Sequence, residues 1–389
     1  MDTAGKIFSV IRRELRIMRQ RPVYLAASLG TFMFCTVFFL TFFRDGIPQD
    51  LPIGIVDNDG SALSREFRRQ TDATQLGQAQ VFGSYAEARE AMQQGKINAF
   101  CVIPEEFAED VQAGRQPRLT FYVNPLYFVG GSLAYKNLLT MVNLASGAVQ
   151  REVLLAKGMD TESAMGMVQP ITIDLHQIGN ATADYGVYLT NVLLPGILGL
   201  IIILVTVYSV GSELKYGTSR HLLEKAGGST ILALTGKLIP YTALYVILGL
   251  ACDVVLYRLA GYPLNGHFIN MAAGMLLFIL ACEATAIFII GTLPVLRVAI
   301  SVAAIYSVLA FSLAGFTFPA EAMPPYVRGL SALFPLRHYW LFYVQEAIFG
   351  SGIRGWWMEA LHLAAFLLLP FPVLKRLGKA YRLLDYPRD

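Results

Sequence analysis

The sequence predicts an α-helical polytopic membrane protein with six transmembrane helices and an inserted extracytoplasmic α/β domain. Hydrophobic residues make up 55% of the 389 residues and charged residues only 15%, with a mean hydropathy of +0.50. A soluble domain carries about 25% charged residues. The apolar residues also gather in runs of about 20, the length that a helix needs to cross a bilayer. A polar stretch of globular composition separates the first run from the second.

Residues 1–22 predict an amphipathic helix that lies in the membrane interface on the cytoplasmic side. Ile7, Ile11 and Leu15 recur at helical spacing, and arginines fill the opposite side. Pro22 ends this helix, and the first transmembrane helix follows over residues 23–43. The other five predicted spans lie between residues 185 and 374, and they cover 185–210, 237–259, 268–290, 298–314 and 356–374.

Residues 44–184 alternate strand and helix patterns, as a small α/β domain does. Apolar runs predict strands over residues 51–56, 80–83, 97–103 and 119–123, with a last strand over 171–175. Helical patterns cover residues 61–70, 84–95, 105–112 and 129–157. Asp57 and Asp59 resemble part of a calcium loop, but the spacing of an EF-hand is missing. We therefore predict a turn that leads into a helix capped by Ser61.

The positions of Lys and Arg predict the orientation, because cytoplasmic loops carry the excess of positive charge. These residues gather in the N-terminal helix, in the loop of residues 211–236, at Arg297 and in the tail of residues 375–389. With six spans, all four places lie on one side of the membrane. We expect a multi-pass protein of a bacterial inner membrane, with both termini in the cytoplasm and residues 44–184 outside.

The sequence lacks motifs for ATP hydrolysis and for metal binding. A P-loop requires G-x-x-x-x-G-K-[ST], and the nearest candidate, at Gly236 and Lys237, has Leu238 instead of Ser or Thr. Neither a helical HExxH motif nor paired cysteines indicates a metal site. We therefore predict that the chain is not an enzyme and has no cofactor of its own. Its net charge of +3 is too small to indicate nucleic acid as a partner.

Residues 315–340 are apolar and aromatic, yet four prolines interrupt them. Proline forbids one straight helix here. Backbone freed in this way cannot face lipid, so the segment is predicted to form a re-entrant hairpin packed against protein. The alternative is an interfacial loop with an aromatic belt.

Ionisable residues within the spans have two interpretations each. Glu283 either lines a pathway or bonds a neighbouring helix, because acids in a membrane face protein or water. Asp253 and Arg258 are predicted to form an interfacial pair. His338 is predicted to be a structural hydrogen-bonding residue rather than a ligand.

Two ordered sets of residues resemble the ABC-2 permease family, the membrane subunits of type 2 ABC exporters. The first set comprises Glu213, Gly217, Thr218, Leu222, Leu223 and residues 236–240. The second comprises residues 315–319, Met323, Pro324, Phe334, Pro335, His338 and Tyr339. The order of one span, a large external domain and five spans resembles one branch of the family, as do residues 55–57 and 103–107. Residues 226–228 and Arg337 depart from the family pattern, which often has Pro and Thr there.

The resemblance implies a role for each set. The loop after the second span would be a coupling helix seated in a cytoplasmic ATPase, and residues 1–22 would be the connecting helix beside it. The coupling residues would be Glu213, Lys215, Tyr216, Gly217, Thr218, Leu222 and Leu223. The hairpin would close the pathway on the outside, with Phe316, Phe318, Pro319, Met323, Pro335 and Glu283 as gate and pathway residues.

The implied function is export of an amphipathic or hydrophobic cargo, such as a drug, a fatty acid or a lipid. The implied partners are ATPase subunits that bind the ATP, a second permease copy (the same chain or a close relative) and membrane lipids. A periplasmic adaptor is left open. Two alternatives come from the residues: a membrane receptor whose external α/β domain binds a ligand, and a secondary transporter. Secondary transporters often show internal repeats, and the sequence shows none.

Overall fold

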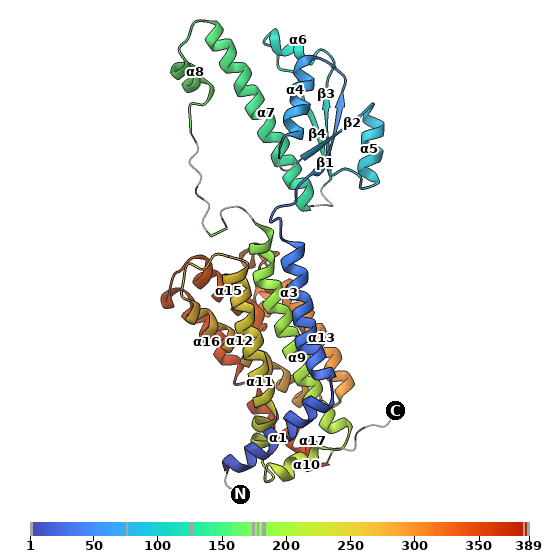
Figure 1. Ribbon diagram of the computed structural model, residues 1–389, viewed down its shortest axis with the longest axis vertical. Coiled ribbons are helices and arrows are strands. Elements are labelled where there is room, and N and C mark those ends of the chain that lie inside the picture. Colours follow the sequence, from blue (N-terminus) through green and yellow to red (C-terminus); the bar gives the residue numbers. More distant parts are fainter. Residues whose placement is uncertain are drawn as a thin grey trace. The chain divides into compact units, whose positions relative to one another are not determined.

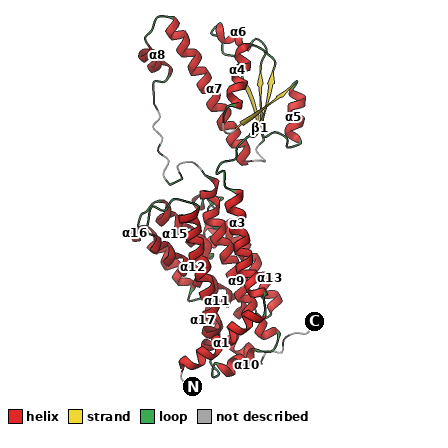
Figure 2. Cartoon of the chain, in the orientation of Figure 1, coloured by secondary structure: helices red, strands yellow, loops and turns green. Residues whose placement is uncertain are grey.

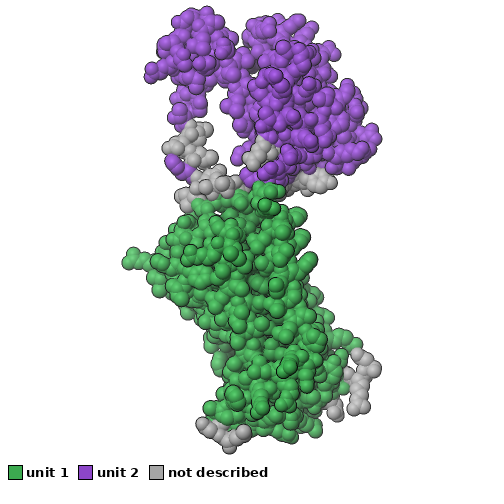
Figure 3. Space-filling view, viewed as in Figure 1, with its two compact units in different colours: residues 1–46, 177–389 green, residues 47–176 purple. Residues whose placement is uncertain are grey.

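The structure is a computed structural model that describes residues 3–74, 77–124, 128–172, 176, 179–180, 184–383 and 386. The chain forms two compact units, one of residues 1–46 and 177–389 and one of residues 47–176 (Figure 3). The first unit is helical and holds all candidate spans, and the second contains the sheet (Figure 2).

The smaller unit is a three-layer α/β structure. Its four strands are β1 (Leu51–Asp57), β2 (Gly77–Phe82), β3 (Ala99–Ile103) and β4 (Thr120–Val123). The sheet order is β2-β1-β3-β4, with β1 parallel to β2 and β3, and β4 antiparallel to β3. The helices are α4 (Ala62–Asp72), α5 (Tyr85–Gln93), α6 (Phe107–Gln112), α7 (Phe128–Ala156) and α8 (Thr161–Val168).

The alternation of side chains along β1 explains the three layers, because successive residues of a strand point to opposite faces. Ile53 and Ile55 pack with Phe67 of α4 and Leu138 of α7 on one face. On the other face, Val56 packs with residues of α5 (Figure 1). The two faces therefore each have their own hydrophobic core.

The four strands and four helices predicted before residue 160 are confirmed, with shifts of one to three residues at their ends. Asp57 Oδ1 accepts hydrogen bonds from the amides of Asp59 and Gly60, at 3.2 and 3.0 Å, and Ser61 caps α4 through Ser64. The expected turn and helix cap are thus confirmed. The strand predicted over 171–175 is absent at Ile171 and Thr172, and residues 173–175 lie outside the described part.

Among the described residues, the larger unit contains six helices long and apolar enough to span a membrane, which confirms the predicted number. They cover Val23–Phe42, Gly186–Lys215, Thr230–Leu259, Phe268–Thr292, Leu296–Leu313 and Ile353–Leu383. The first consists of α2 (Val23–Leu25), the π-helical turn η1 (Ala26–Gly30) and α3 (Thr31–Phe42). The next four are η2–α9 (Gly186–Thr190, Asn191–Lys215), α11–η3 (Thr230–Val254, Val255–Leu259), α12 (Phe268–Thr292) and α13 (Leu296–Leu313). The sixth is α16 (Ile353–Phe366) with α17 (Pro370–Leu383).

Shorter helices connect these spans at the two ends of the unit. At one end, the α1 end, lie α1 (Thr3–Gln20) and α10 (Ser219–Lys225). At the other, the hairpin end, lie η4 (Ala320–Ala322), α14 (Pro325–Ser331), α15 (Pro335–Tyr343) and η5 (Val344–Ile348). Pro325 and Pro335 each begin a helix, where a missing amide hydrogen costs nothing. The prolines thus break the segment into short helices, as predicted.

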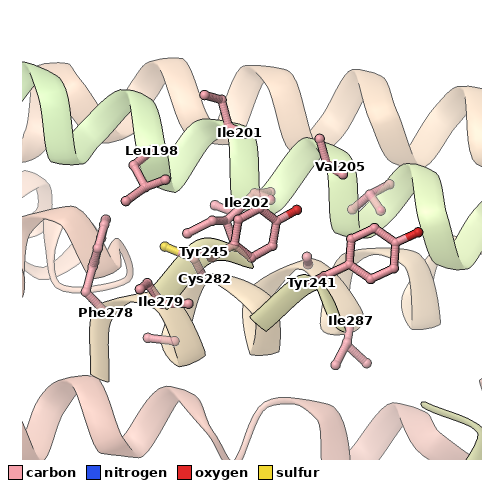
Figure 4. Packing of buried hydrophobic residues seen from close by; sticks show 14 of the residues in the cluster. Leu198, Ile201, Ile202, Val205, Tyr241, Tyr245, Phe278, Ile279, Cys282 and Ile287 are labelled. Carbon is pink, nitrogen blue, oxygen red and sulfur yellow. The ribbon is translucent and has the colours of Figure 1, made fainter. Parts of the chain in front are cut away.

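The core of the larger unit lies between α9, α11 and α12. Leu198 and Ile202 of α9 face Phe278 and Cys282 of α12 (Figure 4). Gly199 permits this approach, because a Cβ there would lie 2.7 Å from the Phe278 ring. The apolar α9 and α12 are buried over most of their length, whereas few side chains of α3, α13 and α16 are buried.

Two predicted boundaries of this unit are corrected. The loop predicted over residues 211–236 is shorter, because α9 continues to Lys215 and α11 begins at Thr230. The C-terminal tail is helical as far as Leu383. Apolar composition located the spans, but the helices continue beyond them into polar residues, some buried, such as Glu213, and some exposed, such as Lys215 and Lys375.

Candidate functional site

A network of four charged side chains, three of them buried, joins three helices at the α1 end. Arg13 and Glu14 come from α1, Glu213 from the last turn of α9, and Lys237 from the first half of α11. Glu14, Glu213 and Lys237 are buried, and Arg13 is largely covered. Two positive and two negative charges balance one another, which is what permits charges so far from water.

The geometry of this charge network is closed. Lys237 Nζ lies 2.8 Å from Glu14 Oε2 and 2.9 Å from Glu213 Oε1. The guanidinium of Arg13 donates to both carboxylate oxygens of Glu213, each at 2.8 Å, and it also pairs with Glu14. Such two-pronged pairs are strong and directional. Burial opposes the charge of Arg13, but the two carboxylates outweigh it and raise the pKa of its guanidinium.

A close approach of α1 to α11 makes the network possible. A Cβ on Gly236 would lie 2.8 Å from Val10 Cβ and 3.1 Å from the carbonyl oxygen of Ile7. Such contacts are too short for any side chain larger than hydrogen. Gly236 therefore lets the backbones approach, and its neighbour Lys237 then reaches Glu14.

The short helix α10 is hydrogen-bonded to the charge network, and its buried side packs against the rest of the unit. Thr218, at its N-terminus, donates its hydroxyl hydrogen to Glu213. Leu222 and Leu223 are buried, and Ser219 donates to the carbonyl oxygen of Tyr381 in α17 at 2.9 Å. Displacement of α10 therefore acts directly on Glu213.

The opposite face of α10 and the turn before it are exposed. Lys215, Tyr216, Arg220, His221 and Glu224 lie on this surface, which we call the α10 face. The Tyr216 ring has the Arg21 guanidinium 5.0 Å and the Lys215 ammonium 5.8 Å from its centroid, a cation–π arrangement. Gly217 adopts a φ of +67°, a conformation that favours glycine.

The seven predicted coupling residues thus divide into two groups. Lys215, Tyr216, Gly217 and Thr218 are exposed, whereas Glu213, Leu222 and Leu223 point into the protein. The exposed group is placed to contact another molecule, and the buried group holds the loop to the spans.

Polar side chains continue from the charge network into the spans. Lys237, Tyr241 and Tyr245 repeat every four residues along α11, and Ser209 and Thr206 follow Glu213 along the facing α9. Figure 4 shows Tyr241 and Tyr245 among the apolar residues between these helices. Hydroxyl groups thus form a buried polar row between α9 and α11.

Glu283 lies deeper in the same region. Both of its carboxylate oxygens are close to the Thr242 hydroxyl of α11, at 2.9 and 2.8 Å. It therefore bonds a neighbouring helix, one of the two predicted interpretations, and its role in a pathway remains a prediction. The predicted pairing of Asp253 with Arg258 is wrong: among the described residues, neither carboxylate oxygen of the buried Asp253 has a hydrogen-bond partner.

The predicted gate residues lie at the hairpin end with different exposures. Phe316 is 9% exposed and packs its ring against Tyr188 and Trp340, at centroid distances of 6.5 and 6.2 Å. Phe318, by contrast, is 53% exposed. Met323 and Pro335 are buried, and Pro319 is exposed. Only part of the predicted gate is thus free to meet another molecule.

The sequence matches one family over most of its length. The model of the family described as ABC-2 family transporter protein aligns with residues 22–373. The chain belongs to the ABC-2 family of transporter proteins. This ABC-2 protein is also 24% identical, over 313 residues, to the "Probable multidrug ABC transporter permease YbhS" of Escherichia coli K12, covering 77% of this chain and 78% of that one. The same values hold for the protein of that name in E. coli O157:H7.

Family membership makes this chain a multi-pass membrane permease, the transport subunit of an ABC transporter that works with an ATPase. Sequence reasoning did not single out Glu14, although it is the one acidic residue of α1 among five basic ones. It also gave Lys237 no role, although an isolated lysine in an apolar span is costly unless paired. The one acidic residue of α1 and the isolated lysine in an apolar span were the features of the sequence that could have indicated the charge network.

Proposed function

We propose that this permease exports an amphipathic or hydrophobic cargo, powered by a separate cytoplasmic ATPase that docks on the α10 face. In this proposal the α1 end lies in the cytoplasm of a bacterial cell and residues 47–176 lie outside its inner membrane. The concentration of Lys and Arg in α1, α10 and α17 supports this orientation.

The observation that carries the proposal is the connection of an exposed helix to buried charges. The α10 face is free, whereas Thr218 on the same loop contacts Glu213, and Glu213 contacts Arg13 and Lys237. Movement of a docked ATPase would displace α10, and the charge network would transmit the displacement to α1 and α11. Apolar contacts alone are not directional and would let the helices slide past one another. Hydrogen-bonded charges hold a fixed geometry, so the helices that carry them move together.

The cargo and the second permease copy are supported by exposed apolar surface. Phe34, Phe38 and Phe42 of α3 form an exposed aromatic row, in which the Phe38 ring stacks with the rings on both sides of it. Val302 and Ile305 of α13 are also exposed. Such surfaces suit lipid, a partner copy and an amphipathic cargo. The multidrug designation of the E. coli relative supports a drug-like cargo.

Cysteine cross-linking tests the docking face. The native cysteines are favourable for this, because Cys101, Cys252 and Cys282 are buried and Cys35 is half-buried. Arg220→Cys places a thiol on the α10 face, and Gln70→Cys places a matched exposed thiol on α4. In cells, a thiol-to-amine cross-linker should join Arg220→Cys, but not Gln70→Cys, to a protein with an ATP-binding P-loop.

Labelling with a membrane-impermeant maleimide tests the orientation on the same two variants. Gln70→Cys should react in intact spheroplasts, and Arg220→Cys only after the membrane is opened. Capture of the ATPase at position 70, or early labelling at position 220, would contradict the proposal and favour a receptor.

A further inference from the structure

Two histidines and a glutamate converge at the hairpin end, away from the charge network. His338 belongs to α15, and Glu359 and His362 belong to α16. His338 Nδ1 lies 2.7 Å from Glu359 Oε2, and His362 Nδ1 lies 3.4 Å from the same oxygen. One donor atom from each residue falls within 4.8 Å of the other two. Three potential metal-ligating groups thus lie close together.

The hydrogen bond made by His338 Nε2 determines whether Nδ1 of the neutral ring carries a hydrogen. His338 Nε2 lies 2.9 Å from the carbonyl oxygen of Ala332, which can only accept, so Nε2 carries a hydrogen. In the neutral ring Nδ1 then presents a lone pair to the Glu359 carboxylate. Two lone pairs at 2.7 Å repel unless a cation lies between them. A backbone carbonyl on the far nitrogen is also the usual support of a metal-binding histidine.

The two distances correspond to different cations: the 2.7 Å between His338 Nδ1 and Glu359 Oε2 is that of a hydrogen bond through a shared proton, and the longer distance to His362 is that of two ligands of one metal ion. The 3.4 Å between His362 Nδ1 and Glu359 Oε2 exceeds the usual range of a hydrogen bond, about 2.7–3.2 Å. It equals the separation of two ligands in a tetrahedral site with bonds of about 2.0–2.2 Å, roughly 3.3–3.5 Å. The closer pair, at 2.7 Å, would have to open by about 0.7 Å to reach the same value. A proton joins two of these groups, and a metal ion uses all three.

The exposure of the three residues leaves one side open. The His338 side chain is 5% exposed, that of Glu359 18% and that of His362 50%. The three groups are therefore open on the side of His362, where a fourth ligand from outside the chain can bind. Glu359 and His362 also lie within the candidate span Ile353–Leu383, where unmatched charge is costly.

We propose that His338, Glu359 and His362 bind a divalent transition metal ion of the zinc class. Two imidazoles and a carboxylate suit Zn²⁺ and its neighbours, whereas Mg²⁺ and Ca²⁺ prefer oxygen ligands alone. The bound ion clamps α15 to α16, and through Ala332 it also holds the turn between α14 and α15. A metal-dependent brace thus stiffens the hairpin that follows Phe316 and Phe318.

The sequence motifs sought for metals did not include this site because its ligands come from two helices. Glu359 and His362 do form a Glu-x-x-His pair on one helix face, a spacing that recurs in metal sites of helical bundles. Its third ligand is 21 residues earlier in the chain. Only the packing of α15 on α16 unites them.

Metal titration of the full chain tests this site. The protein is purified in detergent without a polyhistidine tag, stripped with a chelator and titrated with Zn²⁺ and Co²⁺. Wild-type protein should bind one ion per chain, and Co²⁺ should give the visible absorption of a tetrahedral site. His362→Ala should weaken binding by at least about tenfold, the loss that outer ligand partners alone can cause. His362 is half-exposed, so this variant should still fold.

His221→Ala is the matched control, because His221 also pairs with a glutamate three residues along an exposed helix face but has no third ligand among the described residues. It should bind Zn²⁺ as wild type does. Glu359→Gln should lose binding while keeping the side-chain shape, and Zn²⁺ should raise the Tm of wild type but not of this variant. Equal Zn²⁺ affinity in wild type and His362→Ala, or no binding by wild type, would overturn the metal site and leave a proton-bridged His–Glu pair. These outcomes are independent of ATP-driven transport.

Discussion

The two ends of the membrane unit bury charge in different ways. At the α1 end, Arg13 and Lys237 neutralise Glu14 and Glu213, and every member of the network has an opposite charge beside it. At the hairpin end, the fully buried Glu346 is held by neutral donors only, among the contacts of the described residues. These donors are the amide of His267, the side-chain amide of Asn270 and the indole of Trp356.

This difference determines which substitutions of charged residues each end tolerates. A carboxylate held by neutral donors can be replaced by a neutral acceptor at moderate cost, because no opposite charge is left behind. A balanced ion network cannot lose one member, because the remaining charges stay buried. The α1 end is thus suited to transmit force as a unit, whereas Glu346 can lose its charge without leaving another buried charge unpaired. Four substitutions test this contrast, from the largest expected effect on unfolding to the smallest.

Lys237→Met should have the largest effect. It leaves two buried carboxylates with Arg13 alone, and breaking a buried pair costs about 3–5 kcal/mol. Denaturant unfolding of the purified protein in detergent measures the loss. Adding Glu14→Gln restores the charge balance and should recover much of the stability. Equal unfolding of the single and double variants would argue against a balanced network.

Glu346→Ala should cost about 2–3 kcal/mol, since it removes an acceptor that carries three hydrogen bonds. Glu346→Gln should cost about half as much by the same reasoning. Its carbonyl oxygen still accepts from His267 and Asn270, while its amide group faces the Trp356 indole. Thermal unfolding compares the two variants. A Gln variant as unstable as the Ala variant would mean that the negative charge itself matters here.

Gly217→Ala should cost about 1 kcal/mol, because φ is +67° and only the backbone conformation is strained. Gly261→Ala at the hairpin end is the matched control: φ is +69°, and neither position has an atom within 4 Å of an added Cβ. Both variants should unfold alike, but only Gly217→Ala should impair ATP-driven export per inserted molecule. If both variants impaired export equally, the turn before α10 would have no special role in coupling.

Phe318→Ala should change stability by less than about 0.5 kcal/mol, because its ring is mostly exposed. If the hairpin is the external gate, export per inserted molecule should still become less efficient or less selective. Phe349→Ala, at a phenylalanine of similar exposure at the same end, should leave export unchanged. Normal export by the Phe318 variant would restrict the gate to buried residues such as Phe316.

Much of the site could be anticipated, but its internal arrangement could not. The motif residues Glu213, Gly217 and Leu222 were expected in one loop, and they do lie close in the chain, at the end of α9, in the turn that follows and on α10. Their division into exposed and buried groups depends on α17, because the carbonyl oxygen of Tyr381 accepts a hydrogen bond from the Ser219 hydroxyl. No pattern within the loop contains that information, because the contact spans more than 160 residues.

The sequence by itself determined the six apolar spans, the amphipathic first helix and the strands of the smaller unit, because hydropathy and side-chain periodicity are local properties. Tertiary structure alone decided which charges meet. Glu14 finds Lys237 across 223 residues, Asp253 does not pair with the nearby Arg258, and His338 reaches Glu359 on another helix. The physical reason is that ion pairing is set by the distance between packed helices, and glycines such as Gly236 set that distance by allowing two backbones to touch.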